Sequence, residues 1–509
     1  MEILQPGAPR WVLATTNQLL FPHDRVRSGD NGSFGLRWPG QSVVRFGPLS
    51  EVEILPADTG QAEHGLHLID GILSFFHRGQ PGRFNVMTSG GFAGIKGTEF
   101  VVQVAASNGV EQTTVSVIDG RVAFANGVGS LELTNGQQAV VAAGQAPART
   151  AGFIAKNLLQ WCFYYPGVLD LNDLPLSDGE ITILVKSLAA YRAGDLPAAL
   201  ANYPDPPPPD SGAVRLYHAA LLLGAGQVPG AEADLSSFAI GDASGKLPRL
   251  SEALRTLIAA TKREARLAAS DPQLPSEFLA ASYLEQSRAS PNLSLQSALK
   301  LAREAVARSP DLGFGWERVA ELEFSFGRIE PASEALAHAL RLSPRNAQAL
   351  ALQGFLLAAQ NKPAEAIAQF DQALAVDSAL ANAWLGRGLC RIRQGDRVGG
   401  RDDLLIAAAM EPQRAALRDY LAKAWSDEGD DHRAMKELQL AHALDPVVSG
   451  NSRTVGFSRG FAVIVAQQST QALAAMNCTL GRKWRELRLD DLVLQSLMVS
   501  FLMIMKNEL

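Results

Sequence analysis

The stretch GFAGIKGTEF, residues 91–100, contains three glycines, a lysine and a threonine, which are the residue types of a phosphate-binding loop. A P-loop needs the spacing G-x-x-x-x-G-K-[ST], because backbone N–H groups wrap the phosphates while the lysine and the hydroxyl reach phosphate and magnesium. Here Lys96 and Thr98 fall in the wrong register. The run also continues into Val101 and Val102, which favour a strand, whereas a P-loop would open a helix. The sequence therefore predicts a strand here and argues against nucleotide binding.

Histidines are the other candidates for chemistry in the first third of the chain. His64, His67 and His77 could be considered as metal ligands. A spacing of three on a strand points the first two rings to opposite faces, and no cysteine lies nearby to complete a site. Surface histidines are the better interpretation. Since no serine, cysteine or carboxylate has a convincing partner for nucleophilic or acid–base work, we expect no catalytic residue, no metal site and no cofactor.

The composition sets further limits. A chain of 509 residues is long enough for two to four domains. Its net charge of -6 is mild, and no basic run could neutralise a phosphate backbone, so we expect no nucleic-acid partner. The three cysteines, Cys162, Cys390 and Cys478, are too widely spaced for a disulfide framework or a CxxC metal site.

Neither end of the sequence predicts a membrane segment. The stretch at 1–20 lacks a basic region followed by an apolar one, so we expect no signal peptide in it. The longest apolar stretch, at 492–505, is shorter than the roughly 20 residues of a membrane span.

From residue 25 to about 145, turn dipeptides separate short apolar runs. Apolar residues recur there at period two, which gives each strand one apolar face. The dipeptides tolerate positive φ in a tight hairpin, and they are Asp70-Gly71, Asn108-Gly109, Asp119-Gly120, Asn126-Gly127 and Asn135-Gly136. From Asn108 onward they follow one another at short, nearly even intervals, which predicts an antiparallel meander, sandwich or barrel-like domain with hairpins at these dipeptides.

Four blocks of this region resemble, in order, the successive blocks of the FecR domain. They are HDRVRSGDNGSFGLRW, LHLIDGILSFF, FNVMTSGGFAGIKGTEFVVQV and TTVSVIDGRVAF followed by GSLELTNGQQAVV. The family's most specific block reads Arg-Gly-Thr-Glu-Phe in most members. It is matched here, with lysine for arginine, by Lys96, Gly97, Thr98, Glu99 and Phe100. These residues are expected to be structural, and Glu99 would pair with Lys96 or accept backbone N–H bonds.

The resemblance implies an extracytoplasmic bacterial β domain, in a family named for a regulator that relays the state of an outer-membrane receptor to a sigma factor. It therefore implies the periplasm or cell envelope, with an envelope or outer-membrane partner. Family members usually carry a signal peptide or membrane span, and some β sequence, before the equivalent of Trp11. Both are missing here, which leaves two alternatives: a gene model that starts late, or a copy that stays in the cytoplasm.

The second half of the chain is repetitive, with a period of about 34 residues. Small residues recur at this period, as in Ala298, Ala332 and Ala366, with tryptophan near the start and proline at the end of several units. This pattern resembles the tetratricopeptide (TPR) repeat. The small residues sit where two helices of a pair approach closely. Turn residues that favour a left-handed backbone recur at the same period, and they are Gly327, Asn361, Gly395 and Gly429.

The expected fold is multidomain, with an N-terminal all-β FecR-like domain followed by an all-α TPR solenoid. We expect the β domain at 11–147, a connector at 151–177, degenerate helix pairs at 178–275 with a proline-rich spacer at 204–210, five TPR repeats at 279–446, and an atypical tail at 447–509. A helix at about 484–506 in that tail could cap the solenoid, although a frame change in the gene model would look the same.

The resemblance to TPR proteins also implies which residues face the concave groove. The second, fifth, ninth and twelfth or thirteenth positions of each first helix do so in a typical repeat. Carried onto this chain, these positions are Phe314, Glu317, Glu321, Phe324, Phe355, Asn382, Leu385, Arg393 and Lys423. They lack the paired lysine and asparagine pattern that clamps a C-terminal carboxylate, and several could merely pad the groove.

The sequence thus favours a non-enzymatic protein-interaction scaffold of the bacterial cell envelope, binding other proteins or peptides through the TPR groove. One alternative is an extracytoplasmic signal-relay regulator of the FecR type. A second is a carbohydrate-binding or enzyme accessory module, for which the sequence offers only Trp11, Trp38 and scattered phenylalanines in place of a row of exposed aromatics.

Overall fold

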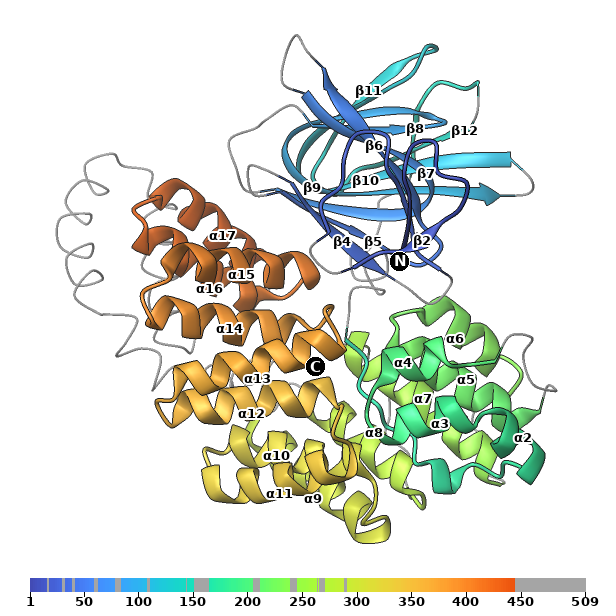
Figure 1. The fold of residues 1–509 in the computed structure, drawn as a ribbon, viewed down its shortest axis with the longest axis vertical. Helices are drawn as coiled ribbons and strands as arrows, with labels where there is room; N and C mark the ends of the chain where they lie inside the picture. Colours follow the sequence, from blue (N-terminus) through green and yellow to red (C-terminus); the bar gives the residue numbers. More distant parts are fainter. Residues whose placement is uncertain are drawn as a thin grey trace. The chain divides into compact units, whose positions relative to one another are not determined.

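A computed structural model describes residues 1–15, 18–29, 33–38, 42–58, 63–77, 84–107, 110–142, 144–150, 164–204, 211–238, 245–262, 264, 271–287 and 291–444. The chain divides into two compact units, Met1–Trp161 and Cys162–Leu509. The first is built of strands and the second of helices, as the sequence predicts (Figure 1). The expected helix in the tail lies outside the described residues, as does the proline-rich spacer from residue 205 onward.

The described strands of the first unit join in one sheet, in the order β13-β12-β10-β9-β8-β7-β6-β3-β1-β2, with β11 on β10, β4 on β5, and β5 and β9 also on β7. The pairs are antiparallel except β7 with β8. The strands are β1 Glu2–Leu4, β2 Val12–Leu13, β3 Arg25–Arg27, β4 Phe34–Trp38, β5 Ser42–Phe46, β6 Glu51–Asp58, β7 Glu63–His77, β8 Phe84–Thr88, β9 Gly91–Ser107, β10 Val110–Ala125, β11 Ser130–Thr134, β12 Gln138–Ala142 and β13 Ala148–Arg149.

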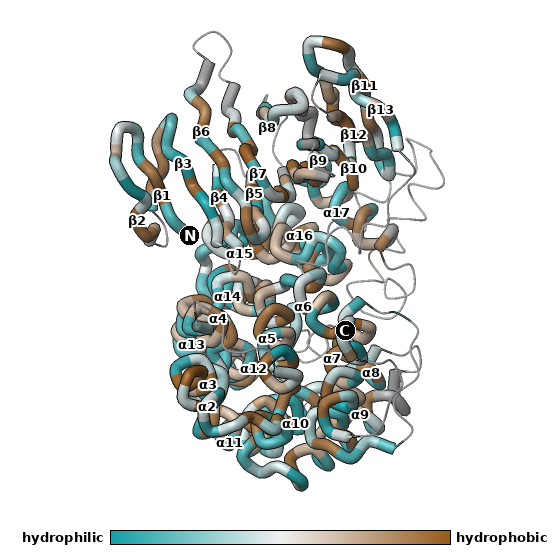
Figure 2. The backbone as a smooth tube through the Cα atoms, turned by 90° about the vertical axis from the view of Figure 1, so that its right-hand side faces the viewer, coloured by the Kyte–Doolittle hydropathy of each residue, from teal (hydrophilic) through white to brown (hydrophobic). Residues whose placement is uncertain are grey.

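Alternation of apolar and polar side chains builds the core of this sheet, as Figure 2 shows along its strands. In β8, for example, Phe84, Val86 and Thr88 are buried while Met87 is 45% exposed. The buried set, which includes Val26, Phe75, Phe100 and Val102, forms one continuous cluster. The sheet also begins earlier than expected, since β1 lies before Trp11 and pairs with β3 through buried Ile3.

Two of the five dipeptides that were expected to form hairpins lie inside long strands instead. Gly71 is in β7 and Gly120 is in β10, both with positive φ. At Gly71 the strand exchanges both its partners, because β7 pairs with β6 and β8 before Gly71 and with β9 and β5 from Gly71 onward. A left-handed glycine lets a strand bend sharply within a sheet, so the dipeptide marks a bend and the prediction of a hairpin there was wrong. Asn126-Gly127 and Asn135-Gly136 do fall between strands, whereas Asn108-Gly109 lies outside the described residues.

The second unit opens with a short extended segment, a 3-10 turn η2 (Leu171–Asp173) and a first set of helices. These helices are α2 Asp178–Ile183, α3 Val185–Arg192, α4 Leu196–Ala201, α5 Gly212–Gly224, α6 Val228–Leu235 and α7 Lys246–Lys262. Ser177 begins α2 with a capping box, and Asp195 caps α4 by accepting the backbone N–H of Ala198.

Ten further helices form five consecutive pairs in the described part of the chain. They are α8 Pro275–Gln286, α9 Pro291–Arg308, α10 Gly313–Ser325, α11 Ile329–Leu342, α12 Ala347–Ala359, α13 Pro363–Val376, α14 Ala381–Arg393, α15 Arg397–Met410, α16 Ala415–Asp427 and α17 Asp431–Leu444. From α10 onward the first helices begin at the period seen in the sequence, at Gly313, Ala347, Ala381 and Ala415.

The turn inside each of the last four pairs confirms the predicted left-handed position. Gly327, Asn361, Gly395 and Gly429 all have φ between 62° and 93°. The predicted small residues at the helix crossings are buried, with Ala298, Ala332 and Ala366 all at 0% exposure. The helical unit therefore contains a TPR-type solenoid, and the strand-rich unit precedes it in the chain.

Candidate functional site

The residues predicted to face the groove all lie on first helices of the pairs. Phe314, Glu317, Glu321 and Phe324 are on α10, Phe355 on α12, Asn382, Leu385 and Arg393 on α14, and Lys423 on α16. Arg393 keeps an intermediate exposure, and each of the others is at most 9% exposed. Their role in binding a partner stays a prediction. At α8 and α10, however, another segment of the same chain already packs on this face.

A buried ionic cluster lies on this face where α10 meets α8. The guanidinium of Arg318 is fully buried and donates to Glu321 at 2.7 Å and to the hydroxyl and carbonyl oxygens of Ser282, both at 3.1 Å. It also lies over the ring of Tyr283, 4.0 Å from the centroid. A buried arginine needs such a complete set of partners, because desolvating the charge costs several kcal/mol.

Glu317 is the second carboxyl group beside Arg318, which is already paired with Glu321. It is 1% exposed, and its Oε1 has no hydrogen-bond partner among the described residues. Burial first, and then the neighbouring Glu321, raises the pKa of Glu317 well above its usual value of 4.5. Burial also raises the pKa of Glu321, and the nearby Arg318 offsets part of that increase. The face therefore favours a protonated carboxyl beside an ion pair.

Residues 164–174, here named the connector segment, run without helix to Asp170, form the turn η2 and pack against the first turn of α10. Gly167 packs under the ring of Phe314 so closely that a Cβ on this glycine would lie 2.7 Å from two ring carbons. Tyr165, Val168 and Leu169 of the segment are each 1% exposed and belong to the same hydrophobic cluster as Phe314. The segment is thus seated on the face that the repeat pattern assigns to the groove.

Side chains of the surrounding helices satisfy the backbone of the connector segment. The hydroxyl of Tyr191 on α3 accepts from the N–H of Leu169 at 3.2 Å and donates to its carbonyl at 3.1 Å. The hydroxyl of Ser276 on α8 accepts from the N–H of Asp170 at 2.8 Å and donates to the carboxylate of Asp173 at 2.9 Å. These side-chain hydroxyls hydrogen-bond the backbone N–H and carbonyl groups of the segment, as a neighbouring strand would in a sheet.

The connector segment runs against the order of the repeats. Tyr164 lies near Asp377, which ends α13, and near Glu317; after burial, these charges raise the pKa of its phenol. Gly167 lies at α10, and Asp170 reaches Ser276 at α8. Helix α3 adds a second contact, because Tyr191 packs against Phe314 with ring centroids 5.3 Å apart.

The turn between α3 and α4 docks on the loop before α12. Arg345 donates to Asp195 at 2.6 Å, its N–H donates to the carbonyl of Ala193, and Ser343 donates to the carbonyl of Arg192. Gly194 has φ +85° at this contact, and a Cβ there would lie 2.6–2.8 Å from atoms of Asn346. The degenerate helix pairs and the regular repeats therefore share one packed body.

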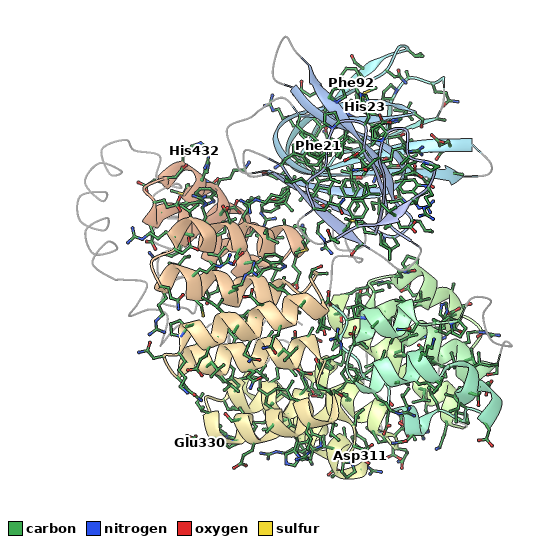
Figure 3. The ribbon with its side chains drawn as sticks, viewed as in Figure 1. Phe21, His23, Phe92, Asp311, Glu330 and His432 are labelled. Carbon is green, nitrogen blue, oxygen red and sulfur yellow. The ribbon has the colours of Figure 1, made fainter. Side chains whose placement is uncertain are left out.

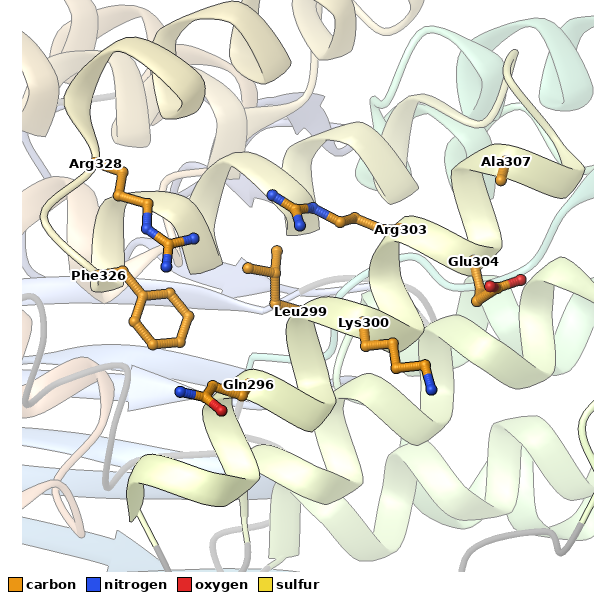
Figure 4. Close-up of a pocket in the computed structure, with 8 residues that line it drawn as sticks. All are labelled: Gln296, Leu299, Lys300, Arg303, Glu304, Ala307, Phe326 and Arg328. Atoms are coloured by element: carbon orange, nitrogen blue, oxygen red, sulfur yellow. The ribbon is translucent and has the colours of Figure 1, made fainter.

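A separate hollow of about 500 Å³ lies along α9 and the turn after α10 (Figure 4). Its polar lining includes Lys300, Arg303 and Arg328. Both arginines pair with the buried carboxylate of Glu323. Because both guanidinium groups are already engaged by Glu323, the hollow offers a weaker recognition surface than the concave face.

The FecR-type motif lies on β9 within the sheet. Lys96 pairs in register with Arg121 of β10, and Glu99 with Asp119. Phe100 is fully buried and Glu99 is 1% exposed, so Glu99 belongs to the interior of the sheet. The register shifts on either side of Asp119, which is where the bend at Gly120 falls. The side chains of residues 96–98 lie outside the described set, so a Glu99–Lys96 pair is not tested.

The aromatic residues that a glycan site would need are engaged or scattered. Trp11 stacks under the guanidinium of Arg27 at 4.2 Å, and Trp38 packs edge-on against Phe84 at 5.1 Å. Phe21 and Phe92 are 60% and 47% exposed on the β unit, where Figure 3 labels them. The carbohydrate-binding alternative gains no support from this arrangement.

No three His, Cys, Asp or Glu side chains among the described residues gather closely enough to ligate a metal ion. No helix in the described ranges has the length and apolar character to cross a membrane.

Comparison with known proteins supports the assignment of the β unit. Residues 24–123 match the family model described as FecR protein, which confirms the resemblance seen in the sequence blocks. No curated protein matches the chain.

Several solved structures are similar to parts of the chain. One, from Parabacteroides distasonis, is described as a candidate anti-sigma factor; it is 17% identical, with a TM-score of 0.24, over 28% of this chain and 69% of that one. The TPR protein TTC0263 of Thermus thermophilus is 18% identical, with a TM-score of 0.33, over 37% and 99%. The type IV pilus biogenesis factor PilW is 20% identical, with a TM-score of 0.32, over 45% and 100%.

Sequence reasoning missed the residues that hold the connector segment. Tyr191 and Ser276 lie before the range predicted for the regular repeats, 279–446, and neither belongs to a motif. Arg318 directly follows the predicted Glu317, but arginine is mostly an exposed residue, so the sequence alone favours a surface position for it. The one available signal is the run Tyr164–Asp170, which is apolar and lacks helical periodicity inside a helical region.

Proposed function

We propose that this chain is a non-enzymatic protein-interaction scaffold of the bacterial cell envelope, which holds extended segments of other proteins on the concave face of its TPR solenoid. The observation that supports this most directly is the seating of the connector segment. Tyr191 and Ser276 bind its backbone, while Phe314 covers its glycine. This is the chemistry by which a groove recognises an extended peptide.

The envelope assignment rests on the FecR match over residues 24–123. The same match favours a second candidate, a regulator that relays the state of an envelope receptor. In that case the β unit would contact the receptor and the solenoid a downstream protein. Both candidates need a protein ligand on the repeats, so one experiment addresses what they share.

Capture from an envelope extract by the immobilised full chain tests this function. Arg393 is the one predicted groove residue with intermediate exposure, so Arg393→Glu is the test variant. Lys186→Glu, at an exposed position of α3, is a matched control for the change of charge. We expect at least one protein that the wild type and Lys186→Glu retain and Arg393→Glu loses. Equal capture by all three chains would contradict a role for the groove.

A further inference from the structure

We propose that the connector segment is an intramolecular ligand of the concave face of the first repeats, and that this face selects peptides of the type aromatic–x–Gly–aliphatic–aliphatic–Asp, where x is any residue. The segment provides this sequence as Tyr165–Asp170, and Tyr165 is 1% exposed in the same hydrophobic cluster as Phe314. The inference deepens the proposed function by naming the ligand chemistry of the groove, and it rests on that function for its biological consequence. A partner with the same chemistry would have to displace the chain's own segment.

Selection for glycine comes from the ring of Phe314. A Cβ at residue 167 would lie 2.7 Å from two ring carbons and 2.9 Å from a third. Real Cβ atoms essentially never approach other atoms that closely, so any other residue would have to shift the ring. That ring is fixed by its contact with Tyr191 and by its burial to 5% exposure. The face therefore discriminates against a side chain at this point of the ligand.

Recognition of the backbone explains why the ligand is extended. The hydroxyl of Tyr191 closes two hydrogen bonds on one residue, Leu169, and the hydroxyl of Ser276 accepts from the next N–H. A helical ligand would already use these backbone groups internally, whereas an extended chain leaves them free to bind. Both hydroxyls belong to groups at most 2% exposed, so each hydrogen bond forms away from water.

Aliphatic and acidic preferences follow from the neighbouring contacts. Val168 and Leu169 enter the hydrophobic cluster formed by α3 to α8 with Phe314. The carboxylate of Asp170 accepts from the N–H of Asn172 and so caps the turn η2, which brings Asp173 onto Ser276. An acidic residue here ends the extended run and orders the turn that follows it.

Tethering makes the segment hard to displace. A ligand that is joined covalently to its site acts at an effective concentration in the mM range. An external peptide of equal intrinsic affinity therefore binds only when it exceeds that concentration or when the tethered segment is weakened.

Binding of a synthetic peptide with the sequence of Tyr164–Leu174 to the full chain tests the proposal. The chains are the wild type, Gly167→Val and the control Gly179→Ala, whose added methyl meets nothing within 4 Å. Chymotrypsin cleavage within residues 164–174 reports release of the segment, and circular dichroism at 222 nm reports that the helices remain folded. Fluorescence anisotropy of the labelled peptide reports binding.

We expect Gly167→Val to be cleaved faster than the other two chains and to bind the peptide at least about tenfold more tightly. A peptide that itself carries valine in place of the glycine should not bind. Unchanged cleavage in Gly167→Val would overturn the proposal, because Phe314 would then tolerate a side chain. Faster cleavage without peptide binding would overturn it as well. Tyr191→Phe removes only a hydroxyl and guards against misfolding. It should speed cleavage less than Gly167→Val does, and it should not tighten peptide binding, because the external peptide loses the same two hydrogen bonds as the segment. These measurements need no partner, so they can fail independently of the capture experiment.

Discussion

The ring of Phe314 lies over Gly167 at a distance that leaves no room for a side chain. Phe314 lies in the first turn of α10, whereas Gly167 lies far earlier in the chain, before the first described helix of the unit. Contact between them makes the segment before the helices part of the solenoid's interior. The stability of that interior therefore depends on residues from both parts of the unit.

Glu317 should make the stability of the helical unit depend on pH. Its pKa is raised above 4.5 in the folded chain, so the folded state holds this proton more tightly than the unfolded state. The stabilisation from that proton is fully present below about pH 4.5 and is lost as the pH rises through the higher folded value. Glu317→Gln removes this loss and should raise the free energy of unfolding at pH 7.5 by at least about 1 kcal/mol.

Denaturant unfolding of the helical unit at pH 5 and pH 7.5 measures the effect. Glu330→Gln is the matched control, since Glu330 is exposed at the start of α11 (Figure 3). It should leave the pH dependence unchanged. A wild-type chain that gains stability between pH 5 and pH 7.5, with Glu317→Gln following the same course, would refute this account of the cluster.

Arg318 should be among the costliest residues to replace. Arg318→Met leaves Glu321 buried without its ionic partner, and breaking a buried pair from one side costs about 3–5 kcal/mol. The double variant with Glu321→Gln removes both charges and should recover more than half of that loss. Thermal or denaturant unfolding measures both variants. A loss below about 1 kcal/mol for Arg318→Met alone would show that water reaches the cluster.

The corner at Gly71 should be intolerant of any side chain. A Cβ there would lie 2.4–2.7 Å from atoms of Ser50 and Leu49, and φ is +92°. Gly71→Ala should therefore destabilise the β unit by at least about 2 kcal/mol. Gly127→Ala, at a turn with nothing within 4 Å, is the control and should be near neutral. Hydrogen exchange of the β-strand amides measures the stability of the β unit separately from that of the helices. Equal exchange in Gly71→Ala and Gly127→Ala would contradict the predicted loss of stability.

Much of the helical unit could be predicted from the sequence, because the sequence of the TPR-type repeats is periodic. The period of the repeats places Gly327, Gly395 and Gly429 in left-handed turns, since one local requirement recurs at each turn. Turn dipeptides predict hairpins less well than the repeat period predicts helix turns. Asp70-Gly71 satisfies the rule for a hairpin, but the long strand β7 continues through it, because tertiary pairing on both sides outweighs the local preference.

Asn361 occupies the left-handed turn position that glycine fills in the neighbouring repeats, where a residue with a side chain is strained. Its φ is +62°, and its Oδ1 accepts from the guanidinium of Arg393 at 2.5 Å. Asn361→Ala loses the hydrogen bond and keeps the strained backbone, so it should cost about 1–2 kcal/mol. Asn361→Gly loses the same hydrogen bond but relieves the strain, so it should cost less than about 0.5 kcal/mol. Unfolding midpoints of the two variants measure this difference, and a less stable glycine variant would contradict the prediction.

The candidate site was harder to predict than the repeats. The periodic pattern assigns Phe314, Glu317 and Glu321 to a groove, but periodicity within the repeats says nothing about what a segment from a distant part of the chain will cover. Tyr191 and Ser276 act through single hydroxyls, and neither belongs to a sequence motif.

Arg418 shows a second limit of prediction from the repeat pattern, because one structural position can be filled by different residue types. It stands one repeat after Trp384, and each donates a side-chain N–H to the carbonyl six positions earlier, at 2.9 Å and 2.8 Å, so different residue types fill one structural role.

Hydrogen exchange at the amides of Leu169 and Asp170 tests the central claim most directly, because each amide is bound by a single side chain, Tyr191 of α3 and Ser276 of α8. We predict that both amides are protected in the wild-type chain. Tyr191→Phe should lower the protection of Leu169 by about three- to tenfold while Asp170 stays protected, and Ser276→Ala should do the converse. Exchange of both amides at the rates of an unfolded peptide in the wild type would contradict the seating of the connector segment on the repeats.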